Sequence, residues 1–463
     1  MTGSTLTWDV EVDVAVAGGG ACGVMTALRA ARDPDLVVAV FERSTREGCN
    51  GAISSGSLAA GGTRFQREAG IEDSPERHAA DILAASGDHE WAPVVHALCA
   101  VAPGLVEWVA DELGYPVEIG ADMPRAGMSV PRLHTDVGRQ GGARLMAHLG
   151  AALERLPNVA LVDEAPVLDL VVEDGAVTGL VVEQNGVRQR VRARSVVLAT
   201  DGFAASPELM AQHCGDLGSP FYGGVSTATG SAVPWLAGLG ATFRNMGACL
   251  RSGLVVVDHG TRVSPALPFN GAVLVGTDGR RFVDEEAHGY SSMAGVLRRQ
   301  PGERAAMVWD AETMAATRHS EMMRDCLAAG AVQDLPDLPA LARALGTTLD
   351  AAAAALAPLP GRRPLVAPYH LAWVTHGVLA TQGGVVVDTT GRVLGPDGEP
   401  VPGLYAGGGT ACGLAGPSSD GYSSGNGLLS AFGFGWIIGD HLASGTRVGS
   451  QASAEREHVP PSG

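Results

Sequence analysis

Residues 12–31 read VDVAVAGGGACGVMTALRAA and begin with an apolar run typical of a buried parallel strand. Three glycines follow in the spacing GxGxxG, at Gly18, Gly20 and Gly23, and the residues after them favour a helix. A second apolar strand comes next and ends in Glu42. This order of strand, glycine loop, helix, strand and terminal acid predicts a dinucleotide-binding unit.

Each residue of this pattern has a physical role in such a site. Gly18 allows the tight turn, Gly20 lets the backbone approach a pyrophosphate, and Gly23 lets helix and strand pack closely. The helix N-terminus offers N–H donors and the positive end of its dipole. We expect Glu42 to accept hydrogen bonds from ribose hydroxyls. The predicted site also takes in the neighbours Ala21, Cys22 and Arg43.

Composition limits the classes of function. The chain has 463 residues, 46% of them hydrophobic, and a net charge of −18, which argues against nucleic-acid binding. Its basic residues are all arginine, so lysine Schiff-base chemistry is excluded. We expect no transmembrane segment, since no apolar run approaches the length of a membrane span. Seven cysteines without metal-site spacing predict no metal, and reduced thiols in the cytoplasm.

Three further stretches carry a family resemblance. They are GCNGAISSGSLAAGG at 48–62, LATDGF at 198–203, and TQGGVVVD…GRVLGPDGEPVPGLYAGGGTACG at 381–413. With the dinucleotide loop, they make the chain similar to the fumarate reductase and 3-ketosteroid dehydrogenase superfamily of flavoproteins. The resemblance implies FAD, an α/β fold with a discontinuous Rossmann-like FAD-binding domain, and an inserted α+β cap domain that holds the substrate.

The amino-acid sequence indicates where these domains begin and end. Helical stretches at 72–114 and 143–156 lead into short meander strands, and the strand 195–200 returns to the main sheet. Mixed short helices and strands then indicate an insertion. We predict the FAD-binding domain at 1–223 and 379–445, the cap domain at 224–378 and a loose tail at 446–463.

The resemblance also assigns residues to FAD. It implies contacts with the pyrophosphate, flavin, adenosine side and ribitol from Gly48, Asn50, Ser54, Gly56, Val167, Thr200, Gly202, Gly408, Gly409, Asn426, Leu428 and Leu429. Relatives often carry an acid where this chain has Gly409, so a water or another side chain must meet the ribitol there. No histidine stands near 48–54, and we therefore expect FAD to be bound noncovalently.

The substrate-binding positions differ from those of fumarate-reducing relatives. Such relatives clamp two carboxylates, with a histidine just before TxGG and an arginine in an RxGGN-like stretch. Here the residues 378–380 before Thr381 are apolar, and Tyr422 stands at the arginine position. Because charge-assisted pairs contribute about 1.5–3 kcal/mol each, their loss disfavours a dicarboxylate substrate.

The same region is similar in spacing to the Δ4 type of 3-ketosteroid dehydrogenase. Tyr422 matches a tyrosine that precedes the last helix of that branch. Its phenol can donate a hydrogen bond to a ketone oxygen, and a backbone N–H of the turn at Gly425 and Asn426 can join it. Such a pair stabilises a developing enolate as an oxyanion hole does.

A candidate base follows from the stretch GRRFVDEEAHGYSS at 279–292. By count, His288 falls where relatives carry an active-site tyrosine, and Tyr290 lies two residues further on. An imidazole with a pKa near ~6.5 is poised for proton transfer, whereas a phenol near ~10 is not. We therefore favour His288 as the base, with Tyr290 as its neighbour or substitute, and expect Arg281 and Glu285 to form a structural ion pair.

The sequence predicts an FAD-dependent dehydrogenase that introduces or reduces a C=C bond α,β to the ketone of a 3-ketosteroid or similar cyclic ketone. A smaller cyclic ketone, such as a 4-oxocyclohexanecarboxylate, is an alternative. A fumarate reductase-like enzyme, with Arg132 and His134 holding the acid, is another. A third is a noncatalytic FAD-binding module. The electron acceptor, whether O2, a quinone or a carrier, stays open.

Overall fold

The computed structural model describes residues 7–87, 90, 92–120, 124–125, 127–137, 141–218, 220–417 and 421–456. The chain divides into two compact units. Unit 1 comprises residues 1–210, 225–248 and 381–463, and unit 2 comprises 211–224 and 249–380. The segment 225–248, which we had placed in the insertion, thus packs within unit 1, and the chain crosses between the units four times.

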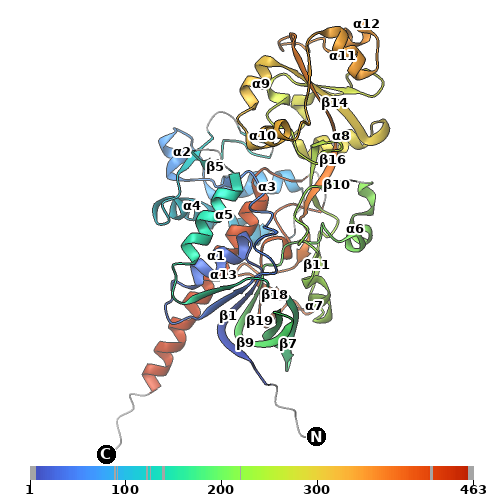
Figure 1. The fold of residues 1–463 in the computed structure, drawn as a ribbon. Helices are drawn as coiled ribbons and strands as arrows, with labels where there is room; N and C mark the ends of the chain where they lie inside the picture. The colour runs from blue at the N-terminus through green and yellow to red at the C-terminus, as the bar shows by residue number, and fades with distance from the viewer. Residues whose placement is uncertain are drawn as a thin grey trace, which may run out of the picture. The chain divides into compact units, whose positions relative to one another are not determined.

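A largely parallel sheet organises unit 1 (Figure 1), in the order β18-β19-β9-β1-β2-β6. Its strands are β1 (Val10–Ala17), β2 (Val38–Phe41), β6 (Val159–Val162), β9 (Val187–Leu198), β18 (Arg392–Leu394) and β19 (Pro400–Ala406). All neighbours pair in parallel except β18 with β19. The last four residues of β1 are buried, as the apolar run predicted.

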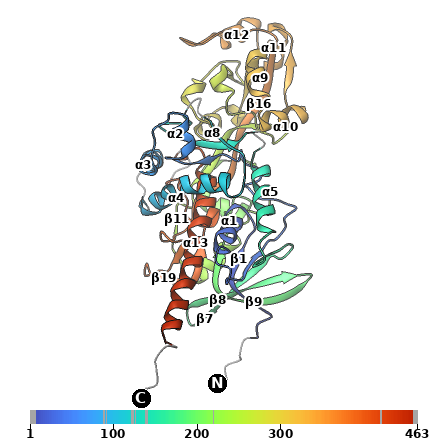
Figure 2. The same cartoon turned by 90° about the vertical axis from the view of Figure 1, so that its left-hand side faces the viewer.

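The meander lies at one side of this sheet. The strands β7 (Val167–Glu173) and β8 (Ala176–Gln184) pair antiparallel with each other, and β8 pairs antiparallel with β9 (Figure 2). The last residues of β9 continue into the parallel sheet beside β1. The prediction of a meander that returns to the main sheet is therefore confirmed for β7, β8 and β9. The strand at 160–164, which we had placed in the meander, is instead β6 and pairs in parallel with β2.

Helices cover the sheet of unit 1, and α1 (Ala21–Ala30) packs along α13 (Asn426–Arg456). Every residue of α1 is buried, so the segment after the glycine loop lies in the core. The other helices are α2 (Arg64–Glu68), α3 (Pro75–Ser86), α4 (Ala92–Asp111), α5 (Gly141–Leu153), α6 (Pro207–Cys214), which crosses into unit 2, and α7 (Ala232–Gly238). Short strands complete the unit: β3 (Leu58–Ala59), β4 (Val117–Ile119), β5 (Leu133–Asp136), β11 (Phe243–Arg244) and β17 (Gly384–Val385).

Two helices depart from the sequence expectations. The helix α13 continues to Arg456, although we expected a loose tail from 446; the last residues, 457–463, lie outside the described part of the chain. The helix α4 is apolar and long enough to cross a membrane by length and composition, whereas the sequence predicted no such segment. Half of its apolar window is buried within the protein, however, and a core helix passes the same test.

Unit 2 is built on a second sheet with the order β10-β16-β14-β13, in which β12 and β15 also pair with β16. Its elements are β10 (Phe221–Tyr222), β12 (Cys249–Val256), β13 (Val273–Gly276), β14 (Arg304–Asp310), β15 (Gln333–Leu335), β16 (Tyr369–Thr381), α8 (Tyr290–Arg298), α9 (Ala311–Thr317), α10 (Glu321–Ala328), α11 (Leu338–Leu345) and α12 (Leu349–Ala355). Along β14, Met307 and Val308 belong to different hydrophobic clusters, because alternate side chains face opposite sides of a strand. Both faces of this sheet are therefore covered.

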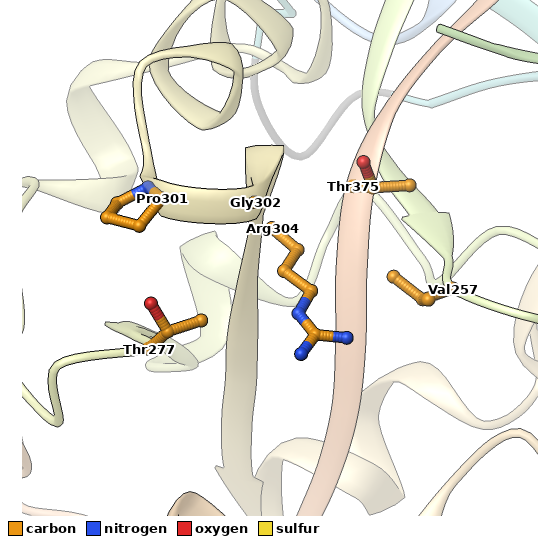
Figure 3. A pocket seen from close by; sticks show the side chains of 6 residues that line it. All are labelled: Val257, Thr277, Pro301, Gly302, Arg304 and Thr375. Carbon is orange, nitrogen blue, oxygen red and sulfur yellow. The ribbon is translucent and has the colours of Figure 1, made fainter. Parts of the chain in front are cut away.

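A pocket of about 500 Å³ opens in unit 2 (Figure 3). The side chain of Arg304 extends between its other lining residues. The lining residues are Val257, Thr277, Pro301, Gly302, Arg304 and Thr375. No residue predicted for the site from the sequence is among them.

Candidate functional site

The glycine loop joins β1 to α1, and two of its glycines are fixed by protein packing. Gly18 has a φ of +104°, and a Cβ there would lie 2.3 Å from the Ala199 carbonyl oxygen. A Cβ on Gly23 would lie 1.9 Å from the Gly18 carbonyl oxygen. Any larger residue at either position must therefore displace backbone.

Gly20 differs from these two glycines. A Cβ there would meet only the Cβ of Cys49, at the ordinary contact distance of 3.5 Å. Gly20 is also the N-cap of α1 and supplies no side-chain cap to the first-turn N–H groups. Protein packing does not demand glycine at this position, whereas close approach of a ligand to the helix N-terminus does.

Glu42 at the end of β2 holds the loop through backbone hydrogen bonds. Its Oε2 accepts from Gly19 N at 2.6 Å, and its Oε1 accepts from Ser44 N at 2.9 Å. A carboxylate can accept about four hydrogen bonds, so two positions stay open for the predicted ribose hydroxyls. The sequence did not reveal the bond to Gly19, which orients the carboxylate beside the loop.

The segment 48–56 folds against the glycine loop and is held by side chains. Asn50 Nδ2 donates to Asp201 Oδ2 at 2.8 Å, and Asn50 Oδ1 accepts from Val225 N at 3.1 Å. Ser54 Oγ donates to Gly51 O at 2.7 Å. Asn50 and Ser54 therefore shape the segment by contacts within the protein.

Gly48 and Gly56 in the same segment have φ of +71° and +67°, respectively. A Cβ on Gly56 would lie 2.7 Å from the carbonyl carbon of Gly141 at the start of α5. Both glycines thus allow the backbone to adopt positive φ, and a Cβ on Gly48 would have open space around it.

Residues 200–203 and 408–410 lie against one another. Thr200 N donates to Thr410 Oγ1 at 2.9 Å. A Cβ on Gly202 would lie 2.1 Å from Thr381 Oγ1, and Gly408 has a φ of +62°. A Cβ on Gly409 would lie 2.6 Å from Asp201 Oδ1. These contacts bring the predicted FAD residues of two distant segments together.

Unpartnered polar atoms mark the N-terminus of α13. Asn426 is fully buried, and neither its Oδ1 nor its Nδ2 has a hydrogen-bond partner among the residues that the structure describes; the same holds for the buried Oγ of Ser430. Burying such a group without a partner costs about 1–3 kcal/mol, so a native protein retains it where a ligand supplies the partner. Leu428 and Leu429, which we predicted to contact FAD, are buried in the same turn, and their contact with FAD stays a prediction.

Tyr422 lies at this helix end. Its side chain is 8% exposed, and its phenol oxygen accepts a hydrogen bond from Gly427 N at 3.3 Å. Gly425 has a φ of +85°, and a Cβ there would lie 2.7 Å from the Cβ of Ala59. The N–H of Asn426 donates to Ser423 O, which leaves the N–H of Gly425 as the candidate second donor of the predicted turn.

The two candidate bases belong to unit 2. His288 follows a short 3-10 helix, is half-buried, and lies 3.5 Å from Ser292 Oγ through its Nδ1. Tyr290 begins α8 and packs on one hydrophobic cluster of this unit. Arg281 and Glu285 form the ion pair that we predicted. The catalytic roles of His288 and Tyr290 stay predictions.

Arg132 and His134 have structural contacts that the sequence left open. The guanidinium of Arg132 is fully buried and ion-paired with Asp73 and Asp81, at 2.7 and 2.5 Å. His134 Nε2 lies 2.8 Å from Thr63 Oγ1. Burial lowers the pKa of His134 to about 4, so its imidazole is neutral at pH 7. Neither side chain offers an unpaired positive charge.

The remaining predicted cofactor residues lie in unit 1. Ala21 and Cys22 form the first turn of α1, and burial raises the pKa of the Cys22 thiol to about 12, so that it is uncharged. Arg43 Nη1 donates to Thr229 Oγ1 at 3.4 Å, and Val167 begins β7 half-buried. Asp201 lies within the motif LATDGF, and the sequence did not mark it as a site residue; its φ of +65° is rare for a non-glycine residue.

Comparisons with known proteins agree with this geometry. The family model described as "FAD binding domain" matches residues 13–428. An NADH:fumarate oxidoreductase from Klebsiella pneumoniae (strain 342) is 28% identical over 460 residues, which cover 94% of this chain. The chain spans about half of that relative, 48% of its length.

Solved structures of two kinds of flavoenzyme share the fold. A flavocytochrome c3 fumarate reductase in an open conformation superposes with a TM-score of 0.81 at 25% identity, over 94% of this chain and 79% of that one. The 3-ketosteroid-Δ4-(5α)-dehydrogenase from Rhodococcus jostii RHA1, solved with 4-androstene-3,17-dione, gives 0.74 at 25% identity, over 95% and 98% of the two chains. The predicted α/β class is thereby confirmed.

Proposed function

This chain belongs to the FAD binding domain family, and its cofactor is FAD. From this membership we propose that the protein oxidises or reduces a C–C bond next to a ketone. The substrate class we propose is a 3-ketosteroid or similar cyclic ketone. One observation carries the proposal: the phenol of Tyr422 lies at the first turn of α13, where relatives that bind dicarboxylates have an arginine.

The residues of unit 1 fit FAD. Gly20 leaves the N-terminus of α1 accessible to a pyrophosphate, and Glu42 keeps two acceptor positions for hydroxyls. The buried amide of Asn426 and hydroxyl of Ser430 have no partner in the described part of the chain, so a ligand could supply one. When bound, FAD supplies the hydride acceptor or donor of the reaction.

Tyr422 would bind the ketone oxygen. Because Gly427 N–H already donates to its phenol oxygen, the phenol becomes a stronger hydrogen-bond donor. The N–H of Gly425 adds a second donor, and both stabilise charge that develops on the oxygen during enolisation. His288 would take the α-proton as general base, and Tyr290 is its neighbour or substitute.

The charges of unit 1 support a ketone over a dicarboxylate. Arg132, one candidate cation for a dicarboxylate site, is fully buried between two carboxylates. Recruiting it to a substrate would leave Asp73 unpaired in the interior, at a cost of several kcal/mol. His134 is neutral at pH 7 because burial lowers its pKa to about 4.

The similarity to fumarate reductases keeps a second candidate, reduction of an unsaturated acid. Anaerobic titration of the FAD-loaded protein distinguishes the two. We expect a 3-ketosteroid, or a substituted cyclohexanone, to bleach the flavin absorbance near 450 nm, with no change on adding succinate. Reoxidation of the dithionite-reduced protein by enones but not by fumarate is expected in turn. A response to the acids alone would overturn the ketone proposal.

Tyr422→Phe tests the residue that carries the proposal. Removing the phenol donor should lower turnover by about tenfold or more, equivalent to ~1.4 kcal/mol of transition-state stabilisation. FAD content should not change. The control is Tyr115→Phe, because Tyr115 is equally buried in unit 1 but contacts Arg144 and His148 instead. Equal turnover of the two variants would remove Tyr422 from the site.

A further inference from the structure

Asp201 occupies an unusual place in unit 1. It follows β9 in the left-handed backbone region, with a φ of +65°. Its Oδ1 accepts from Gly202 N at 2.7 Å, and its Oδ2 accepts from Asn50 Nδ2 at 2.8 Å. Burial raises the pKa of this carboxyl. A charged group held in this way has a local energetic cost that a ligand can offset.

The carboxylate fills the space beside Gly409. A Cβ at position 409 would lie 2.6 Å from Asp201 Oδ1 and 2.7 Å from Gly202 N. A side chain at 409 and the observed position of Asp201 therefore exclude each other. The sequence had left open which group replaces the acid that relatives often carry at 409, and Asp201 is the carboxylate that lies there.

The surroundings of Asp201 belong to the FAD-binding segments. Asn50 comes from the segment 48–56, Gly409 follows β19, and the charge of Asp201 acts on the thiols of Cys22 and Cys49. Two of about four acceptor positions on the carboxylate are used by Asn50 and Gly202. FAD offers hydroxyl donors on its ribitol and ribose, whereas its pyrophosphate would repel a carboxylate.

We propose that Asp201 is the carboxylate that accepts a sugar hydroxyl of FAD, in place of an acid at position 409. The acidic group has thus moved from the loop after β19 to the loop after β9, and it still reaches the same space. Asp201 is a binding residue in this proposal, and Asn50 orients it.

Asp201→Asn tests the contact without changing the backbone, because asparagine also tolerates positive φ. FAD affinity of the FAD-depleted protein, measured by quenching of flavin fluorescence, should weaken roughly tenfold to hundredfold, as for the loss of a charge-assisted hydrogen bond. Analogues of FAD that each lack one ribitol or ribose hydroxyl complete a double-mutant-type cycle, in which the protein group and the ligand group are removed in turn. For the analogue without the contacted hydroxyl, the wild type and the variant should bind equally. If the variant loses the same factor with every analogue, Asp201 acts only through Asn50 and the proposal fails.

Relocation of the acid gives a second test. Gly409→Asp alone places two carboxylates in one space and should weaken FAD binding more than Asp201→Gly alone does. The double variant Asp201→Gly/Gly409→Asp should bind FAD more tightly than either single variant. Circular dichroism of each apoprotein checks that it folds. A folded double variant that binds no better than the weaker single variant would overturn the proposal.

Discussion

The buried carboxylates of unit 2 and the buried side chains at the N-terminus of α13 in unit 1 are partnered differently. Unit 2 also buries one indole nitrogen, Trp309 Nε1, that has no partner among the described residues. In unit 2, the fully buried Glu285 pairs with Arg281 and accepts from Leu274 N at 2.8 Å, and Asp310 pairs with Arg363. These carboxylates are satisfied within their own unit. In unit 1, by contrast, buried atoms at the N-terminus of α13 have no partner in the part of the chain that the structure describes.

The difference indicates how each unit reaches its stable state. Since an unpartnered buried group costs about 1–3 kcal/mol, we expect unit 1 to gain stability if FAD supplies the missing partners. The carboxylates of unit 2 need no ligand, because arginines already compensate them. Substitutions in the two units should therefore change different properties: FAD binding in unit 1 and stability in unit 2.

Glu285→Ala should have the largest effect on stability. Removing this carboxylate leaves Arg281 without its buried partner, and breaking such a pair costs about 3–5 kcal/mol. Hydrogen exchange measured by mass spectrometry should show faster exchange in β13 and β14, with β1 and β2 of unit 1 unchanged while FAD is bound. Glu312→Ala is the control, because its carboxylate is 77% exposed. Equally faster exchange in β1 and β2 would contradict the separation of the two units.

Gly23→Ala tests whether a substitution in unit 1 weakens FAD binding. Its Cβ would lie 1.9 Å from the Gly18 carbonyl oxygen, so the loop must move. Overpacking of this kind costs about 1–3 kcal/mol, and FAD should bind up to ~100-fold more weakly, as measured by flavin fluorescence.

The matched control for this glycine is Gly150→Ala in α5. A Cβ at Gly150 meets nothing within 4 Å, and alanine favours helix over glycine by about 1 kcal/mol. Gly150→Ala should bind FAD normally and unfold at slightly higher temperature. If both variants bind FAD equally well, the loop does not depend on the close approach at Gly23.

Local patterns allowed much of this fold to be predicted. The apolar run of β1, the GxGxxG spacing and Glu42 follow one another within 32 residues or so, and periodicity and glycine chemistry suffice to interpret them. The roles of Gly18 and Gly23 agree with their contacts in the structure. The meander was predictable for the same reason, since its strands are neighbours in sequence.

Contacts between distant segments could not be predicted in this way. Asn50 binds Asp201 and the backbone of Val225, and no periodic pattern links positions so far apart. Arg132 looked like a possible substrate ligand because its two carboxylate partners precede it by 51 and 59 residues. The membership of 225–248 in unit 1 likewise depends on packing that only the folded chain reveals.

Acid should destabilise the two units at different pH values, because their buried titratable groups have different pKa values. Burial, and then the nearby charge of Arg132, lower the pKa of His78 in unit 1 to about 4, and burial does the same for His134. In the unfolded chain each imidazole titrates near ~6.5. The unfolded state therefore binds more protons between these values. The contribution of these two neutral imidazoles to the stability of unit 1 is complete above pH ~6.5 and is lost as the pH falls towards 4.

Asp310 of unit 2 behaves differently. Its burial raises the pKa, but hydrogen bonds from Arg363 and from the N–H groups of Thr313 and Val366 outweigh burial and bring it to about 2. Its contribution is present above ~4, the pKa of an unfolded aspartate, and is lost only as the pH falls towards 2. Unit 2 should therefore keep this contribution at pH values where unit 1 has already weakened.

His78→Gln provides the smallest and most specific test of this contrast. Between pH 7 and 5 the wild type should lose about 1–2 kcal/mol of unfolding free energy through His78, and the variant should lose correspondingly less. Urea unfolding followed by hydrogen exchange in β1 and β14 assigns the loss to a unit. His96→Gln is the control, because His96 is exposed on α4. The contrast between the units holds only if the pH dependence of the unfolding free energy changes in β1 and does not change in β14. Identical slopes for His78→Gln and His96→Gln would show that burial of His78 does not make unit 1 sensitive to acid.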